Sequence, residues 1–437
     1  MPPPSPAASM PEPATLRVCD DDEEVVVGSR EQLLHLLAEA AEIEHSLMCS
    51  YLYAAFSLRT EEEDGLDEPR RAVVRRWRDA IMDVAVQEMG HLLMVANLTV
   101  AVGGRPHFSR PNFPISTGYF PAAVVVRLTG FSRETLDHFI HLERPRGVAG
   151  QDDPAFEQED YQREQIHLGL MPSTQDYATI GHLYEAIRAN LVHLAEHLGE
   201  EALFIGARGR QIGRALVDLP GVDEVGSLAE ACAALDMIIE QGEGSPADRA
   251  DSHYQAFSAI GGELARLSAA DPGYRPAWPV ASNPVLRRPP EPEDKIFIDD
   301  AAAAELLDFG CATYGLLLRL LVQSFGREGA GQQAALVNGA IELMHVLGAA
   351  GRALARMPAS LSAPGIHAGL SFTMLRGIEP LLQPSEGPVL AEQIMALLRA
   401  ARRIASLPEA VRGTLAGLAA KLPAELRALP EGAVAGG

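Results

Sequence analysis

Residues 69–104 carry an apolar stripe with the period of an α-helix, and two members of that stripe are ionisable. A spacing of three to four residues places the whole stripe on one helical face. A carboxylate buried there without a partner would cost several kcal/mol. The segment therefore predicts a core helix in which Glu88 and His91, one turn apart, meet a compensating group. The stripe consists of Val74, Trp77, Ile81, Val84, Glu88, His91, Val95 and Leu98.

A helix of similar length precedes this one. Ser29 and Gln32 form an S-x-x-Q capping box, which is typical of a helix start. The apolar stripe that follows runs at helical spacing to Leu58 and includes Glu44. The sequence thus predicts two consecutive long helices, each with an acidic residue on its buried face.

A long segment, residues 105–172, separates these helices from the next two. It is rich in proline and aromatic residues and predicts a crossover with one short helix. A third helix is expected from Ser173 or Thr174, and a fourth from Ser227, with a break at Gly242 and Gly244. Two long helices, a long crossover and two more helices are the connectivity of a ferritin-like four-helix bundle. We therefore expect an all-α fold of this type.

The chain divides into four regions by composition. Residues 1–28 form a disordered or extended N-terminal segment, and residues 29–270 form the metal-binding bundle with the insertion 105–172. A proline-rich stretch at 271–300 predicts a stiff linker or a strap. Residues 301–437 contain further apolar helical patterns and predict a helical C-terminal domain.

Charge and cysteine content exclude several classes of protein. A formal charge of −23 repels phosphates, so we expect neither a nucleic acid nor a membrane as partner. The cysteines at 19, 49, 232 and 311 form no C-x-x-C pair, which argues against a disulfide framework or a thiolate zinc site. No apolar run reaches the ~18 residues of a membrane span, and residues 1–14 lack the features of a signal peptide. We expect a cytoplasmic protein.

The pair Glu88-x-x-His91 has the spacing of a metal-ligand pair. Residues three apart share a helix face, so one turn offers an oxygen and a nitrogen to one ion. Glu44 fits as the carboxylate of the first helix, although Glu42 and His45 compete with it. The alternative interpretation is a buried ion pair or hydrogen bond without metal.

The second half of such a site is harder to assign. In the third helix, Glu185 lies one position off the apolar stripe, and an ordinary surface residue is as good an interpretation. In the fourth helix, Glu240 or Glu243 could ligate, but no histidine follows at i+3, and His253 after the break is the nearest one. The pattern departs here from two Glu-x-x-His motifs.

Two histidine pairs and a second Glu-x-x-His motif are interpreted as structural or solvent-exposed. Glu342-x-x-His345 lies beyond the linker without a partner motif, and His193 with His197 is flanked by acidic residues. The pair at positions 138 and 141, on the short crossover helix, is expected at the surface.

Several sequence blocks share a common resemblance. They are EIEHSLMCSYLYAAFSL, VQEMGHLLMVANLTVAVGGRPHFSRPNFP, FIHLERP, TIGHLYEAI, EQGEG with SHYQAF, and HAGLSFTMLRGIEPLL. Together they resemble the ferritin-like domain of the iminophenyl-pyruvate dimer synthase family, which includes proteins of violacein and rebeccamycin assembly that couple two aryl-pyruvate imines oxidatively. The resemblance spans residues 30–380. It implies as metal-facing residues Glu44, Glu88, His91, Glu185, Glu240 and His253, with Glu243 as an alternate.

The sequence supports one leading function and two alternatives. We expect a non-haem dinuclear iron or manganese oxidoreductase of secondary metabolism, acting on an aromatic small molecule, with a homodimer as one possible assembly. The loop with Phe108, Phe113, Tyr119 and Phe120 would form a lid. Haem is used by some relatives, but no residue here marks a haem ligand. The alternatives are a metal-binding protein without small-molecule turnover and a catalytically idle scaffold.

Overall fold

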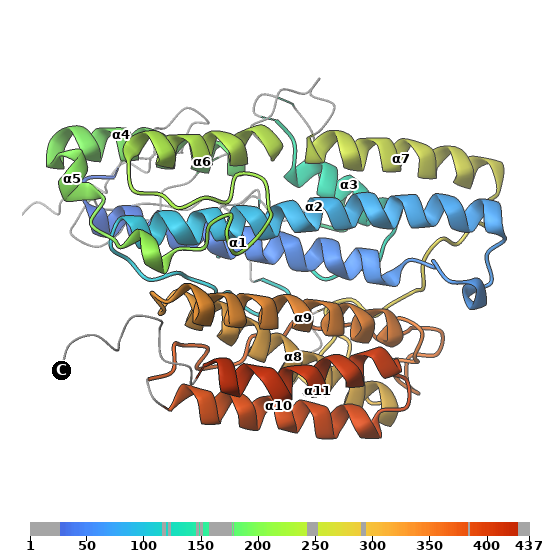
Figure 1. Cartoon of the computed structure of the whole chain (residues 1–437). Helices are drawn as coiled ribbons and strands as arrows, with labels where there is room; N and C mark the ends of the chain where they lie inside the picture. Colours follow the sequence, from blue (N-terminus) through green and yellow to red (C-terminus); the bar gives the residue numbers. More distant parts are fainter. Residues whose placement is uncertain are drawn as a thin grey trace, which may run out of the picture.

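The first two long helices begin where the sequence indicates. In the computed structural model, Ser29 caps α1 (Arg30–Ser57), and its hydroxyl accepts the backbone N–H of Gln32 at 3.3 Å. Asp67 caps α2 (Glu68–Ala101) and accepts the N–H of Arg70 at 2.9 Å. The two helices pack along each other and form the middle layer of the molecule (Figure 1).

The described part of the chain is all-α, as predicted. It comprises residues 27–115, 119–120, 124–145, 148, 152–156, 177, 179–242, 252–289, 294–382 and 385–426. Within these ranges only isolated β-bridges occur, and no residue lies in a β-strand. The further α-helices are α3 (Arg133–Leu142), α4 (Ile180–Leu198), α5 (Glu200–Leu203), α6 (Leu228–Gln241), α7 (His253–Ala270), α8 (Ala301–Ser324), α9 (Ala330–Leu354), α10 (Glu386–Arg403) and α11 (Glu409–Glu425).

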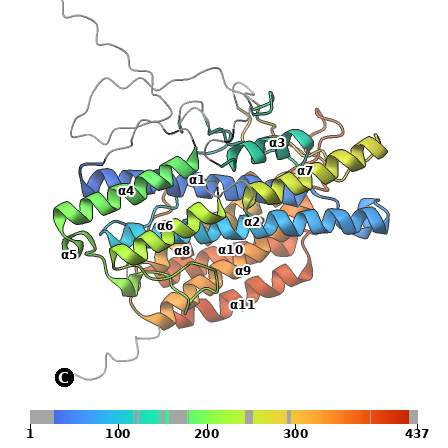
Figure 2. The ribbon, with the colours of Figure 1, turned by 90° about the horizontal axis from the view of Figure 1, so that it is seen from above.

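Helices cover both faces of the α1–α2 pair. On one face lie α4, α6 and α7, with α3 beside α7; on the other lie α8 and α9, which α10 and α11 cover in turn (Figures 1 and 2). Helices α6 and α7 follow α2 one after the other, so the fourth helix of the bundle is interrupted between Gln241 and His253. The break falls where Gly242 predicted it.

The third bundle helix begins later than expected. The sequence favoured Ser173 or Thr174 as its start, whereas α4 is capped by Thr179, whose hydroxyl accepts the N–H of His182 at 3.2 Å. All three residues can cap a helix, so the pattern alone does not decide between them.

The proline-rich stretch packs against both parts of the chain. Ala277 bridges to Leu58 at the end of α1, and Val280 bridges to His367 in the C-terminal part. Ala281 and Ile298 are buried in the core. The stretch is thus a strap that follows the molecular surface rather than a spacer.

Two helices are long and apolar enough to cross a membrane by length and composition alone, namely α2 and α9. In their most apolar windows, 83% and 50% of the residues are buried inside the protein. The apolar surface of α2 is therefore used mainly for packing against the neighbouring layers.

An ion pair joins the α1–α2 turn to the C-terminal helices. Asp64, in the short 3-10 turn η1 (Glu62–Asp64), accepts from Arg356 Nε at 2.7 Å and from its Nη2 at 3.0 Å. The Asp64 side chain is 1% exposed. Burial acts to raise its pKa, but the hydrogen bonds and charge of Arg356 and the backbone of Glu61 and Thr60 hold that pKa below its usual value.

We predict that Arg356→Met lowers the free energy of unfolding at pH 7, because it leaves the Asp64 carboxylate buried and unpaired. The expected loss is about 1–3 kcal/mol, measured by urea denaturation. A depressed pKa stabilises the fold above the usual aspartate pKa near 4, and that contribution disappears as the pH falls. The difference between the variant and the parent should therefore shrink below pH about 4. Equal stability at pH 7 would contradict the assignment.

Candidate metal centre

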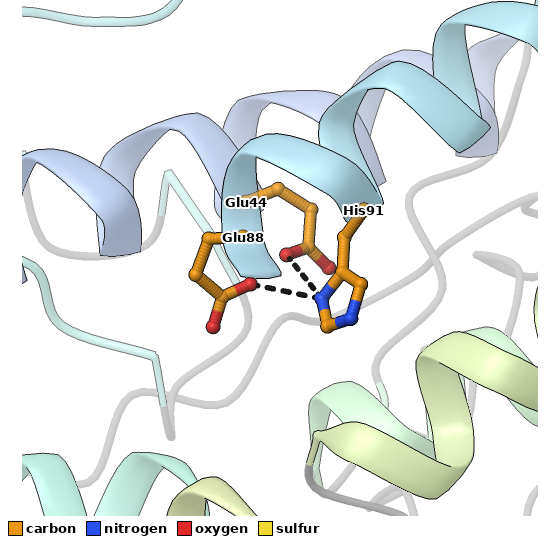
Figure 3. A group of neighbouring side chains, drawn as sticks. All are labelled: Glu44, Glu88 and His91. Atoms are coloured by element: carbon orange, nitrogen blue, oxygen red, sulfur yellow. Dashed lines mark hydrogen bonds and ion pairs between the residues drawn. The ribbon is translucent and has the colours of Figure 1, made fainter. Parts of the chain in front are cut away.

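Three buried ionisable side chains meet at the centre of the α1–α2 pair. Glu44 on α1 and Glu88 and His91 on α2 are 3%, 2% and 1% exposed. His91 Nδ1 lies 3.0 Å from Glu88 Oε2 and 3.5 Å from Glu44 Oε2 (Figure 3). The predicted i, i+3 pair and the predicted carboxylate of the first helix therefore do face one another.

A second group of the same composition adjoins the first. Glu143 follows the last residue of α3, and His253 is the first residue of α7; both are buried. His253 Nδ1 lies 3.1 Å from Glu88 Oε1 and 3.3 Å from Glu143 Oε2. Glu88 thus contacts one imidazole with each of its two oxygens and belongs to both groups.

Two tyrosines hold the outer carboxylates. Tyr184 on α4 donates its hydroxyl hydrogen to Glu44 Oε1, and Tyr51 on α1 donates to Glu143 Oε1. Both tyrosines are buried. Each outer carboxylate therefore keeps one oxygen bound to a phenol and turns the other toward a histidine.

Two glutamine side chains hydrogen-bond to the outer ring nitrogens of the imidazoles and fix their orientation. His91 Nε2 lies 3.0 Å from Gln241 Oε1, and His253 Nε2 lies 3.1 Å from Gln87 Oε1. An amide oxygen accepts a hydrogen bond, so each Nε2 carries the hydrogen. Both Nδ1 atoms are then the nitrogens that face the carboxylates, and such an outer hydrogen bond is the usual support of a metal-ligating histidine.

Burial and mutual repulsion shift the protonation of the carboxylates. Burial, followed by the charge of Glu88, raises the pKa of Glu44 to about 8. For Glu88, burial acts to raise the pKa, but the hydrogen bond from Glu44 and the charge of His253 outweigh burial and hold the pKa well below its usual value. In the metal-free protein near pH 7, the inner carboxylate is therefore ionised and Glu44 is protonated.

Contacts with the carboxylates also favour the protonated form of both imidazoles. Burial favours the neutral ring, but contacts with Glu44 and Glu88 hold the pKa of His91 well above its usual value. For His253, Glu143 and Glu88 overcome burial and raise the pKa to about 9. Protons thus supply, in the metal-free protein, the positive charge that this buried acidic cluster requires.

The cluster fits a pair of metal ions. Three carboxylates and two neutral imidazoles would offset three of the four charges of two divalent cations. Glu143 Oε2 and His253 Nδ1 are buried and face each other at 3.3 Å, without the geometry of a regular hydrogen bond. A space of about 10 Å³ also adjoins Glu44, Glu88 and His91, which is the size of one small ion or water.

The structure brings some of the predicted ligands together and leaves others apart. Glu185 is half-buried on α4 and Glu240 is exposed on α6, and neither belongs to the two groups. In both helices the adjacent residue contacts the cluster instead, namely Tyr184 and Gln241. Glu243 lies outside the described residues.

The sequence did not predict Glu143 as a site residue, and its prediction that His138 lies at the surface is wrong. Glu143 follows the last residue of the short crossover helix α3, whose apolar face of Leu136, Phe139 and Leu142 is buried. Its signal in the sequence was indirect, because the second half of the site lacked a second Glu-x-x-His motif and Glu143 lies in the shared block FIHLERP. His138 on the same helix, expected at the surface, is 1% exposed and pairs with Asp152 at 2.8 Å, because the crossover folds over it.

The other histidine pairs lie outside both groups. His193 and His197 are exposed on α4, which confirms a solvated face. On α9, Glu342 is half-buried and His345 is exposed. None of these four residues belongs to a group that could hold a metal.

Comparison with known proteins gives the same fold and the same relatives as the sequence blocks. The chain is 29% identical over 360 residues to dichlorochromopyrrolate synthase of Lentzea aerocolonigenes, covering 73% of this chain and 33% of the relative. It is 27% identical over 350 residues to 2-imino-3-(indol-3-yl)propanoate dimerase of Chromobacterium violaceum, covering 73% of this chain and 31% of that protein. The chain therefore spans about a third of the length of these relatives.

Structural and family comparisons complete this result. A crystal structure of a ferritin like protein from Caulobacter vibrioides aligns with 76% of this chain and 96% of its own, at a TM-score of 0.45 and 18% identity. The family model described as Ferritin-like matches residues 37–261, which include both groups of the candidate centre. The resemblance drawn from the sequence is confirmed, and the chain belongs to the ferritin-like family.

Proposed function

We propose that the chain holds a dinuclear, non-haem iron or manganese centre and acts as an oxidoreductase of secondary metabolism. The observation that carries this proposal is the position of Glu88, whose two oxygens each contact a different histidine. One ion would lie among Glu44, Glu88 and His91, and the other among Glu88, Glu143 and His253. Glu88 would bridge the two.

The ligand types favour iron or manganese. Both groups offer only carboxylate oxygens and imidazole nitrogens, and such ligands suit these ions better than soft copper(I). With three protein ligands each, both ions would retain open positions. When bound, such a pair supplies one-electron redox steps at two adjacent ions.

The protein contributes rigidity and exclusion of water. The tyrosine bonds to Glu44 and Glu143 and the glutamine bonds to the histidines fix every outer ligand before an ion arrives. All five ligands are at most 3% exposed. A dry site strengthens the attraction between the carboxylates and the ions.

The relatives support an aryl imine as substrate. One of them is named as a dimerase of an indolyl imino acid. Joining two such molecules by a carbon–carbon bond releases two protons and two electrons, so the reaction needs a two-electron oxidant such as dioxygen or peroxide. We extend this substrate class to the present chain, which covers about a third of that relative.

One observation favours a second function, metal binding without small-molecule turnover. The space beside Glu44, Glu88 and His91 has a volume of about 10 Å³, which is too small for an aromatic molecule. The idle-scaffold alternative loses its main support, because Glu143 and His253 complete the second half that the sequence pattern lacked.

We predict that the protein binds two iron or manganese ions per chain, one for each group. Glu88→Gln should abolish binding of both, because it removes the bridge, and Glu143→Gln should remove about half of the metal. Glu185→Gln is the matched control on α4 and should retain both ions. Elemental analysis after anaerobic loading and desalting measures this. Full occupancy in Glu88→Gln, or loss in Glu185→Gln, would contradict the assignment.

Metal binding should release protons and strengthen as the pH rises. The ions must displace protons from Glu44, His91 and His253, whose raised pKa values keep them protonated near pH 7. Manganese affinity should therefore increase between pH 6 and about 9, where the pKa of His253 lies. Calorimetry in two buffers of different ionisation enthalpy counts the protons. An affinity that does not change over this range would argue against the cluster as the binding site.

Turnover distinguishes the two proposed functions. An aryl imino acid, generated from tryptophan or phenylalanine by an amino-acid oxidase, should be consumed by the iron-loaded protein. The product should have twice the mass of the imine less two hydrogens, detected by mass spectrometry. Glu88→Gln should give none. If the loaded parent protein also gives none with either amino acid, metal binding without turnover is the better assignment.

A further inference from the structure

A large cavity lies on the opposite face of the α1–α2 pair from the metal centre. It has a volume of about 570 Å³ and lies between α1–α2 and α8–α9. Its walls are mostly apolar, and four methionines line it, which gives the walls adaptable shape. Phe108, predicted as part of a lid for the metal site, lines this cavity instead. The methionines are Met48, Met82, Met89 and Met344.

The cavity has a polar wall at its buried side. His45 on α1 and Tyr314 on α8 both line it, and both are at most 2% exposed. The Tyr314 hydroxyl is hydrogen-bonded to His45 Nε2. Arg110 stands directly behind them, with its Nη2 at 3.1 Å from the same hydroxyl. At the opposite rim, Val86 and Ile341 are 37% and 36% exposed, which marks the opening between α2 and α9.

Arg110 carries a positive charge that no described residue balances. It is 5% exposed, and its hydrogen bonds go to Tyr314, Cys49 and the carbonyls of Pro111 and Phe372. Burial raises the pKa of the Cys49 thiol and of the Tyr314 phenol, so both partners are neutral near pH 7. A buried guanidinium with only neutral partners favours a nearby anion, since its charge is weakly screened.

We propose that this cavity binds a small apolar anion. Its negatively charged head would lie at the wall formed by His45 and Tyr314, where Arg110 behind them supplies the opposite charge. Its apolar or aromatic body would lie among the methionines and the phenylalanines Phe108 and Phe372. The site is separate from the metal centre, and the inference does not depend on the proposed function.

A pair of fluorescent probes tests the proposal on the whole chain. 8-Anilinonaphthalene-1-sulfonate carries an anionic head, and N-phenyl-1-naphthylamine has the same ring system without it. We expect each to bind once per chain, with or without EDTA. Met48→Trp should fill the cavity and weaken both at least tenfold. Arg110→Met should weaken the sulfonate at least tenfold and the neutral probe less than twofold.

Two further variants distinguish a specific loss of anion binding from a general loss of folded structure. Arg352→Gln removes a cation at the rim and should change either affinity less than threefold. If Arg110→Met does not fold, as judged by circular dichroism, Tyr314→Phe replaces it and should weaken the sulfonate alone. The proposal is overturned if neither probe binds stoichiometrically, if Met48→Trp leaves both affinities unchanged, or if the Arg110 or Tyr314 variant weakens both probes equally.

Discussion

The fold of the bundle depends on how it compensates the charge of Glu88. This carboxylate lies in the middle of the longest helix and is 2% exposed, so it requires positive charge within contact distance. That charge comes from His91 on its own helix and His253 on α7, and each histidine brings a further carboxylate, Glu44 or Glu143. The cluster thereby links α1, α2, the C-terminal end of α3 and the N-terminal end of α7 through alternating carboxylates and imidazoles.

The α1–α2 pair presents a different chemistry on each face. Two neighbouring residues of α1 face opposite sides, because Glu44 points to the candidate metal centre and His45 to the apolar cavity. Helices α4, α6 and α7 close the first face, and the C-terminal helices α8 and α9 close the second (Figure 1). The C-terminal part therefore completes a cavity wall, which gives it a role beyond covering the bundle.

The sequence predicted the part of the site that lies on regular helices. Glu44, Glu88 and His91 follow from the apolar stripes of α1 and α2, whose faces are fixed by the helical period. Glu185 and Glu240 illustrate the limit of that argument, because one residue shifts a side chain by about 100° around the helix. The rotation of α4 and α6 about their axes depends on tertiary packing, and it placed Tyr184 and Gln241 at the cluster. Glu143 depends on the path of the crossover, which brings the C-terminal end of α3 to the cluster, and the helical period of α3 alone does not indicate that position.

Anomalous scattering from crystals loaded with manganese tests the central claim most directly, because it places each ion relative to named side chains. We expect two peaks on opposite sides of the Glu88 carboxylate, one beside His91 Nδ1 and one beside His253 Nδ1. A single peak away from Glu88, peaks at Glu185 or Glu240, or a metal-free cluster in fully loaded protein would contradict the claim.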